Sequence, residues 1–276
     1  MFYNNSQRFR AAPRVAVVTG GNKGIGYEVV RGLVRSKQFG RVYLTARNDD
    51  LGKAAVDALR AEESADCIDF HPLDVTSQNS ITTFAHFITE KHGGLDVLVQ
   101  NAGIAPMPND DQTILEQTIL TLNTNFWGVL NMMKTFEPII KQGGRIVSIS
   151  SFNSLLALFD FKPHFMVNPI GQQFGSLNAA ITVEQLENYA KQYISDIENK
   201  NDKNGWPSDF YGLTKLLVNN ITRIYGYVNH SIYYHVFTLS ISSYRAPIHY
   251  LLGPYFLTRI FLTRNFLTRN FLTRNF

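Results

Sequence analysis

Short apolar runs rich in β-branched residues alternate with helix-patterned segments along the first 150 residues of the chain. Strands are expected at residues 14–19, 41–45, 67–70, 95–99 and 145–149, with helices at 27–36, 51–63, 80–91 and 115–140. Strands that alternate with helices of this length are joined by right-handed crossovers. The sequence therefore predicts an α/β fold with a doubly wound parallel sheet, the Rossmann fold, whose ligands bind beyond the carboxyl ends of the strands.

Residues 152–207 interrupt this alternation with a polar segment that carries scattered aromatic residues. The sequence Thr-Val-Glu-Gln at 182–185 has the pattern of a capping box, which predicts a helix that continues to about residue 198. A second helix is expected from about residue 209. The chain thus has a helical insertion between its fifth strand and the helix that contains Tyr211 and Lys215.

The composition changes from about residue 225 onward. Acidic residues vanish, and Phe-Leu-Thr-Arg occurs four times near the end of the chain. A repeat of five residues matches neither the period of a strand nor that of a helix. We therefore predict one domain over residues 1–225, followed by a low-complexity tail over residues 226–276.

Charge and cysteine content limit the classes of function. The chain has 26 Lys and Arg against 22 Asp and Glu, spread without a basic block, which argues against nucleic acid as a partner. Cys67 is the single cysteine, so no intrachain disulfide is possible and a cytoplasmic location is expected. The first residues lack the apolar core of a secretory signal. Residues 224–244 are uncharged but contain scattered Asn, His and Ser, so no membrane span is expected.

A glycine-rich turn follows the first expected strand. Residues 19–26 read Thr-Gly-Gly-Asn-Lys-Gly-Ile-Gly, immediately before a helix whose free N–H groups favour anions. In a βαβ unit this turn is where backbone approaches the pyrophosphate of a dinucleotide. The alternative is a tight turn with no ligand. The candidate cofactor contacts here are Gly20, Asn22, Lys23, Gly24, Ile25 and Gly26.

The end of the second strand favours NADPH over NADH. An NAD site would carry an acidic residue there for the ribose 2′-hydroxyl, whereas this chain has Arg47, which suits a 2′-phosphate. Lys23 is a second candidate for the same phosphate. Further candidate contacts follow the third and fourth strands, at Asp74, Val75, Asn101, Ala102 and Gly103.

The strongest sign of chemistry is Tyr-Gly-Leu-Thr-Lys at residues 211–215, with Ser151 at the end of the fifth strand. Side chains four apart share a helix face, so Lys215 is expected beside the Tyr211 phenol, where it would lower the pKa of that phenol. Such a tyrosine is suited to donate a proton to a carbonyl oxygen. The seven histidines show no paired ligand spacing and one cysteine cannot form a thiolate site, so no metal is predicted.

Together these motifs resemble the short-chain dehydrogenase/reductases in order and spacing. The resemblance rests on the glycine turn, Asn101-Ala-Gly103, Asn125, Ser151 and the segment from Tyr211 to Lys215. The sequences Thr-Asn-Phe-Trp-Gly at 124–128 and Gly-Trp-Pro-Ser at 205–208 are similar to the NADPH-dependent carbonyl reductases, as is the long interval between Ser151 and Tyr211. That subfamily is monomeric, and its inserted helical segment covers a surface that others use for oligomerisation.

The resemblance implies a role for each catalytic candidate. Tyr211 would be the general acid in hydride transfer from NADPH to ketones, aldehydes or quinones, and Ser151 would stabilise the carbonyl oxygen. Lys215 would hold the nicotinamide ribose, and Asn125 would hold a water that links Lys215 to solvent.

The chain departs from the family at two places. Gln100 stands where these reductases usually have an asparagine. After residue 224 nothing matches the sixth strand, its Pro-Gly motif or the seventh strand, so the last strands are expected to be missing. Residues 231–241 nevertheless have the composition of a strand. The alternative function is a catalytically inactive NADP-binding protein that lacks the C-terminal nicotinamide and substrate elements.

Overall fold

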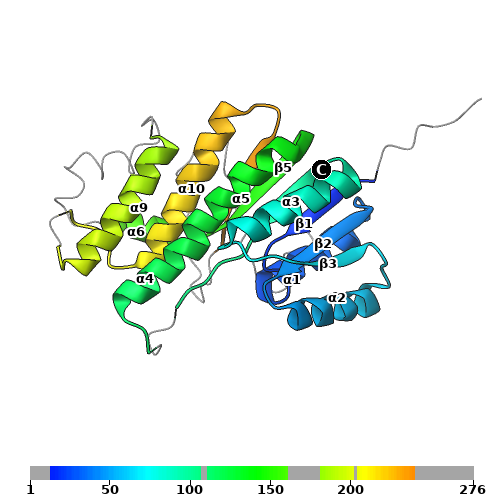
Figure 1. Ribbon diagram of the computed structural model, residues 1–276, viewed down its shortest axis with the longest axis horizontal. Helices are drawn as coiled ribbons and strands as arrows, with labels where there is room; N and C mark the ends of the chain where they lie inside the picture. Colours follow the sequence, from blue (N-terminus) through cyan, green and yellow to red (C-terminus); the bar gives the residue numbers. More distant parts are fainter. Residues whose placement is uncertain (1–12, 107–110, 161–180, 202–203, 240–276) are drawn as a thin grey trace, which may run out of the picture.

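The computed structural model describes residues 13–106, 111–160, 181–201 and 204–239, and shows one parallel sheet with helices on both faces (Figure 1). The six strands lie in the order β3-β2-β1-β4-β5-β6. Every strand pair is parallel, which confirms the predicted doubly wound fold. The strands are β1 (Val15–Val18), β2 (Arg41–Ala46), β3 (Ile68–Pro72), β4 (Leu95–Gln100), β5 (Ile140–Ser151) and β6 (Tyr233–Leu239).

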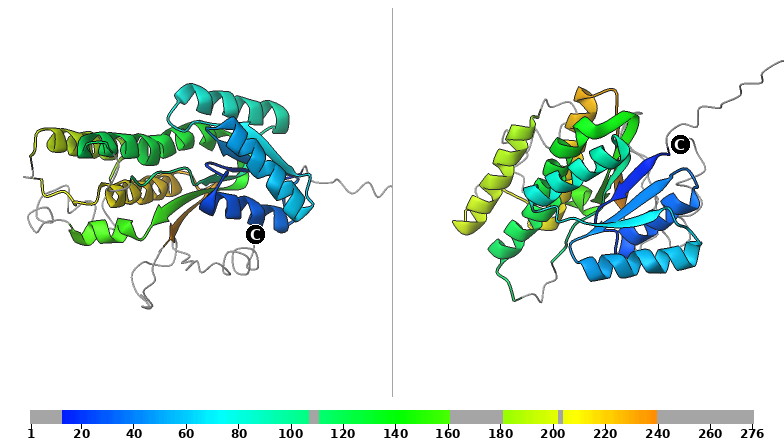
Figure 2. Two further views of the ribbon diagram at one scale, coloured as in Figure 1. Left: turned by 90° about the horizontal axis from the view of Figure 1, so that it is seen from below. Right: turned by 45° about the vertical axis from the view of Figure 1, so that its right-hand side comes forward.

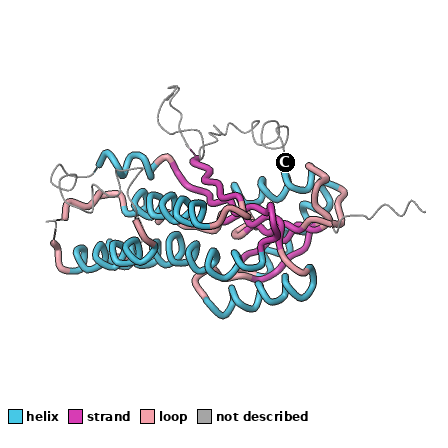
Figure 3. Tube along the Cα trace, turned by 90° about the horizontal axis from the view of Figure 1, so that it is seen from above, coloured by secondary structure: helices cyan, strands magenta, loops and turns pink. Residues whose placement is uncertain are grey.

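Apolar side chains of the sheet pack into helices on both of its faces. One buried cluster joins the sheet to helices α1 and α2, and a larger cluster joins the opposite face to the later helices (Figures 2 and 3). Strands buried on both faces are expected to be almost continuously apolar, as β1 is. The helices are α1 (Gly24–Arg35), α2 (Asp49–Glu63), α3 (Gln78–His92), α4 (Ile114–Leu122), α5 (Gly128–Phe136), α6 (Asn153–Asp160), α9 (Val183–Glu198) and α10 (Phe210–Val228).

The expected long helix at 115–140 is interrupted. A π-helical turn, Asn123–Trp127, separates α4 from α5, and a 3₁₀ turn, Glu137–Ile139, follows α5. Such single π turns inside helices are frequent at functional sites. The interruption matters here because Asn125, a candidate catalytic residue, lies within the π-helical turn.

The sheet continues beyond the fifth strand. β6 pairs with β5 in parallel from the register of Arg145 with Tyr233 to that of Ser151 with Leu239. The expectation that the last strands are missing is therefore wrong for the sixth strand, and the strand-like composition of residues 231–241 was the better guide. Backbone pairing to the exposed edge of β5 explains this outcome, because it satisfies groups that an edge strand leaves unpaired. The positions expected for a Pro-Gly motif and a seventh strand lie outside the described residues.

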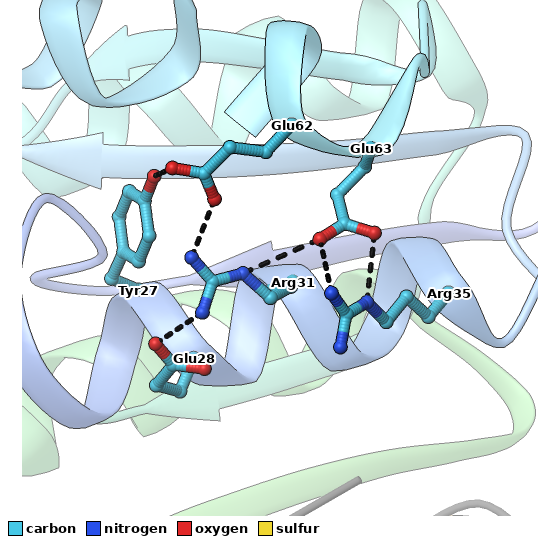
Figure 4. A network of polar contacts seen from close by, with 6 residues as sticks. All are labelled: Tyr27, Glu28, Arg31, Arg35, Glu62 and Glu63. Carbon is cyan, nitrogen blue, oxygen red and sulfur yellow. Dashed lines mark hydrogen bonds and ion pairs between the residues drawn. The ribbon is translucent and has the colours of Figure 1, made fainter. Parts of the chain in front are cut away.

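Charged side chains link α1 to α2 (Figure 4). Arg31 on α1 pairs with Glu28 of its own helix and with Glu62 of α2, at 2.6 Å for the second pair. Arg35 binds Glu63 through two nitrogens at 2.7 and 2.8 Å. Exposed ion pairs add little to stability individually, but a two-pronged pair fixes geometry. The network therefore holds the orientation of α1, the helix that begins at the glycine turn.

No helix in the described part of the chain is both long enough and apolar enough to cross a membrane.

Candidate active site

The glycine turn between β1 and α1 is packed too tightly for side chains. A Cβ atom on Gly26 would lie 2.4 Å from the Gly20 carbonyl oxygen and 2.5 Å from Asn101 Nδ2. Gly20 has a φ of +63°, in the left-handed region that glycine adopts without strain. A Cβ there would also come within 3.0 Å of the Ala102 backbone. The glycines thus allow two backbone segments to meet at the carboxyl ends of β1 and β4.

Thr19 and Asn101 hold these two segments together. The N–H groups of Asn101 and Ala102 both donate to Thr19 Oγ1, at 3.0 and 2.9 Å. The Asn101 amide donates in return to the carbonyl oxygens of Thr19 and Gly20, each at 3.0 Å. The turn is therefore ordered by its own contacts. The helix that follows it begins at Gly24, with Asn22 half-buried and Ile25 packed against the core beneath α1.

Two cations lie beside this turn with their charges exposed. Lys23 is the residue before α1, and Arg47 follows the last residue of β2. Neither charged side-chain group makes a hydrogen bond or an ion pair with any residue that the structure describes, although the Lys23 carbonyl oxygen accepts from the Tyr27 N–H. Because β1 and β2 are neighbours in the sheet, both cations stand at the same edge of it. The sequence predicts that these two cations bind an anionic group.

The loops after β3 and β4 carry the other residues that the sequence predicts as cofactor contacts. Asp74 is half-buried, and its Oδ1 accepts hydrogen bonds from the Thr76 N–H and hydroxyl at 2.9 and 2.7 Å. This carboxylate is therefore partly used in its own turn. Val75 is buried and lies against Gly128 at the start of α5. A Cβ on Gly103 would lie 3.2 Å from Asn125 Oδ1 and 3.4 Å from Lys215 Nζ, so Gly103 packs against two of the predicted catalytic residues.

Asn125 is fully buried and joins three parts of the fold. Its Oδ1 accepts from the Ile104 N–H at 2.9 Å, and its Nδ2 donates to the Ile104 carbonyl oxygen at 2.9 Å and to Thr214 Oγ1 at 3.2 Å. The amide thus fixes the loop after β4 against α10. Position 125 reaches this loop from the π-helical turn.

Lys215 and Tyr211 lie one turn apart on α10, as their spacing predicts. Lys215 Nζ lies 5.7 Å from the centroid of the Tyr211 ring and donates to the Ile149 carbonyl oxygen on β5 at 2.9 Å. Lys215 is only 6% exposed, and burial lowers the pKa of its ammonium group to about 8. A lysine with this pKa is partly neutral near physiological pH.

The pKa of Tyr211 moves in the direction opposite to our expectation. Burial of the phenol raises it above the ordinary value, a hydrogen bond with Ser151 opposes this shift, and the negative charge of Asp209 adds to it. The prediction that Lys215 lowers this pKa is therefore wrong for the structure described here. The physical reason is that desolvation of the phenol dominates, while the buried ammonium of Lys215 is directed at a backbone carbonyl.

Ser151 ends β5, and its hydroxyl is held by the start of α6. Ser151 Oγ donates to Asn153 Oδ1 at 3.3 Å and accepts from the Asn153 N–H at 3.2 Å. Asn153 Nδ2 in turn donates to Asp209 Oδ2 at 2.9 Å. Asn153 and Asp209 were not among the predicted site residues. Asp209 had a local signal, because an aspartate three residues before Gly212 fits the N-cap of α10, but nothing in the sequence pointed to Asn153.

The structure therefore gathers the predicted residues at one edge of the sheet. Ser151 comes from β5, Tyr211 and Lys215 from α10, and Asn125 from the π-helical turn, next to the glycine turn of β1. A phenol, a hydroxyl and an amine on neighbouring elements can donate protons to an oxygen that gains negative charge. Among the described residues no group of three or more His, Cys, Asp or Glu side chains is arranged to hold a metal ion.

Comparison with known proteins agrees with this fold. The family model of the short chain dehydrogenases matches residues 14–163. The chain belongs to the short-chain dehydrogenase family of oxidoreductases.

Within that family, the chain is similar to carbonyl reductases. The chain is 40% identical over 211 residues to carbonyl reductase (NADPH) 1 of Mus musculus, which covers 76% of this chain and 73% of that protein. It is 41% identical over 212 residues to the Homo sapiens protein of the same name, with the same coverage. The chain is thus a member of the carbonyl reductase subfamily.

Solved structures share the fold. Menthone neomenthol reductase from Mentha piperita superposes with a TM-score of 0.70 at 26% identity, covering 83% of this chain and 90% of that one. Salutaridine reductase from Papaver somniferum also gives 0.70, at 27% identity, covering 82% and 85%. The parallel sheet with its flanking helices is thus a short-chain dehydrogenase fold.

Proposed function

We propose that this protein reduces ketones, aldehydes or quinones by hydride transfer from NADPH, with Tyr211 as the general acid. The observation that carries the proposal is the meeting of Ser151, Tyr211 and Lys215 beside Gly103 and the glycine turn. The relatives named as NADPH carbonyl reductases support the choice of substrate class.

The residues on the nucleotide side fit NADPH. A Cβ on Gly26 or Gly20 would meet backbone atoms, so only glycine lets the start of α1 pack this closely against the end of β1. A pyrophosphate would bind at the free N–H groups at the start of that helix. Lys23 and Arg47 are exposed cations that would bind the 2′-phosphate, and Asp74 and Val75 would contact the adenine. Asn101, Ala102 and Gly103 would line the cofactor path between adenine and nicotinamide. Bound NADPH supplies the hydride.

The remaining residues act on the carbonyl oxygen. Tyr211 donates a proton to the oxygen as negative charge develops on it, and Ser151 donates a hydrogen bond that stabilises the same charge. A raised pKa keeps the Tyr211 phenol protonated at neutral pH, which is the state that a proton donor needs at the start of a reduction. Lys215 would hold the ribose hydroxyls.

Asn125 is proposed to take part in proton resupply. Its Oδ1 accepts one hydrogen bond from Ile104 within the described chain, and a carbonyl oxygen has room for a second. A water held there would link Lys215, whose Nζ lies close to the same side of Gly103, to solvent. The monomeric state and the cytoplasmic location expected from the sequence remain proposals, and size-exclusion chromatography with light scattering would test the first.

The test is NADPH oxidation by the purified full-length chain with menadione and an aromatic aldehyde as substrates, with fluorescence-detected NADPH binding in parallel. Tyr211→Phe is expected to lower kcat by about 100-fold or more, since a positioned acid contributes at least that much, and to leave NADPH affinity unchanged. Tyr227→Phe, which alters an exposed tyrosine on the same helix, is the matched control.

Two results would count against the proposal. Full turnover by Tyr211→Phe would exclude Tyr211 as the acid. NADPH binding without turnover of either substrate by the wild-type chain would instead favour the inactive NADP-binding protein. The alternative function rests on the absence of a Pro-Gly motif after the sixth strand, at positions outside the described residues. Only this assay therefore separates an active reductase from an inactive NADP-binding protein.

A further inference from the structure

A chain of hydrogen bonds connects Ser151 to the first turn of the helix that carries Tyr211. It runs from Ser151 at the end of β5 through Asn153 at the start of α6 to Asp209, the N-cap of α10. Asp209 Oδ1 accepts from the Gly212 N–H at 2.9 Å, in the first turn of the helix that carries Tyr211. Ser151 and Tyr211 are sixty residues apart in sequence, and this bridge joins their supporting elements directly.

The carboxylate of Asp209 determines which way the Asn153 amide points. An ionised carboxylate only accepts hydrogen bonds, so Asp209 Oδ2 selects the NH₂ end of the amide, at 2.9 Å. The carbonyl end of Asn153 is then left facing Ser151, whose hydroxyl donates to it at 3.3 Å. The Asn153 N–H donates to the oxygen of the same hydroxyl at 3.2 Å. One residue thus holds the Ser151 side chain from both sides. Because the hydroxyl has a single proton, it would turn this proton from Asn153 Oδ1 to the carbonyl oxygen during reduction, while the Asn153 N–H still donates to Oγ.

The joint between α6 and α10 has little room to rearrange. A Cβ on Gly212 would lie 2.7 Å from the Asn153 carbonyl oxygen and 2.7 Å from Asp209 Oδ2. A second link runs parallel to the bridge, in which Asn219 Nδ2 donates to Ser154 Oγ at 3.0 Å and Ser154 Oγ donates to the Ser151 carbonyl oxygen at 2.7 Å. The first turn of α6 is therefore fixed against α10, and the two helices lie side by side in Figures 1 and 2.

We propose that Asn153 and Asp209 are positioning residues for carbonyl reduction: Asp209 orients the Asn153 amide, and Asn153 holds the Ser151 hydroxyl in fixed relation to the helix that carries Tyr211. This inference rests on the proposed function. It adds two residues that act through the Ser151 hydroxyl and the first turn of α10, and so set the geometry between the oxyanion donor and the acid. A small misplacement of either donor is expected to be costly, since catalysis depends on close alignment.

The bridge also places a negative charge beside the acid. Among the described residues, the charged groups that face Tyr211 are Asp209 and Lys215, both on or next to α10, while β5 and α6 present the neutral Ser151 and Asn153. The Asp209 charge raises the pKa of the Tyr211 phenol. Removal of the charge therefore has an expected direction, toward a lower pKa of Tyr211.

The test compares two substitutions of Asp209 that differ in helix capping. Asp209→Ser keeps a good N-cap for α10 but loses both the bridge and the charge, whereas Asp209→Ala loses the cap as well. Both are expected to lower kcat by about tenfold with KM for NADPH unchanged, and only Asp209→Ala is expected to lose stability through the lost cap. Asn153→Leu replaces the amide with an apolar side chain of similar volume, and it is expected to lower kcat by the same factor. Thr182→Ala, which removes the cap of α9, controls for a purely structural effect.

A second measurement does not depend on turnover. In protein labelled with ¹³C at tyrosine Cζ, the Tyr211 signal is identified by its loss in Tyr211→Phe, and its titration midpoint is followed with pH. Asp209→Ser is expected to lower this midpoint, and the alkaline limb of kcat/KM is expected to move to lower pH with it.

The outcomes separate the two proposals. Wild-type kcat in Asp209→Ser and Asn153→Leu, or an unmoved Tyr211 midpoint in Asp209→Ser, would overturn the positioning roles while leaving carbonyl reduction intact. If the wild-type chain shows no turnover, the proposed function fails, and the Tyr211 midpoint alone decides whether Asp209 acts on the acid.

Discussion

The nucleotide side and the catalytic side of this site are built in different ways. The nucleotide side is made by backbone: Gly20 and Gly26 allow close approach, and N–H and carbonyl groups around Thr19 and Asn101 bind one another. The catalytic side is made by buried polar side chains from distant segments, among them Asn125 and Lys215. The first arrangement has no space for a side chain at Gly20 or Gly26, and the second depends on keeping each polar group paired.

The largest effect is expected when a side chain is added to the tightly packed glycine turn. Gly26→Ala would place a methyl group 2.4 Å from a backbone oxygen, and we expect a loss of about 3 kcal/mol in the free energy of unfolding together with loss of NADPH binding. Urea unfolding and fluorescence titration would measure both. Gly32→Ala is the control, because a Cβ there meets nothing within 4 Å and alanine favours a helix. Equal behaviour of the two variants would contradict the tight packing of the turn.

On the catalytic side, the buried Lys215 is expected to make the stability of the protein depend on pH. The Lys215 ammonium has its pKa lowered to about 8 in the folded protein, below the value near 10.4 of an unfolded chain. Between these values the unfolded state binds one more proton, so stability rises with pH. The buried Lys215 charge therefore lowers the unfolding free energy most below pH about 8. Between pH about 8 and the unfolded pKa, the unfolding free energy recovers by about 1.4 kcal/mol per pH unit.

Lys215→Met removes this titrating group. We therefore expect the unfolding free energy of the wild type to increase relative to that of Lys215→Met as the pH rises from 7 to about 9.5. Urea unfolding of both proteins across this range would measure the difference. Parallel stability curves would show that Lys215 is less desolvated than the structure indicates.

A charge on the nucleotide side is expected to affect affinity and not the fold. Arg47→Ala removes an exposed cation proposed for the 2′-phosphate, so NADPH affinity should fall about tenfold while NADH affinity stays the same. Lys53→Ala alters another exposed cation, on α2, and serves as the control. An equal loss for NADH and NADPH would assign Arg47 a general role in place of recognition of the 2′-phosphate.

The smallest expected effect concerns Gln100, at the end of β4. This side chain is 3% exposed, and neither Nε2 nor Oε1 has a hydrogen-bond partner among the described residues. Gln100→Leu replaces an unpaired buried amide with an apolar group of similar size, so we expect a gain of about 1 kcal/mol in unfolding free energy with catalysis unchanged. A loss of stability would show that the amide is paired after all.

Local sequence was sufficient for the elements that depend on local rules. Apolar periodicity predicted β1 to β5 and the helices between them, and the capping sequence at Thr182 predicted α9. It failed where distant contacts decide. The helix expected at 115–140 is broken by the π-helical turn around Asn125, and β5 extends back to Ile140, well before the expected start at residue 145.

The sequence by itself determined the parallel α/β fold, the glycine turn and the identity of the candidate catalytic residues, because each depends on residue type and short spacing. Tertiary structure alone decided three things: the pairing of β6 with β5, the raised pKa of Tyr211, and the bridge from Ser151 through Asn153 to Asp209. Each results from burial or contact between segments far apart in the chain, which spacing within a single helix or strand does not specify.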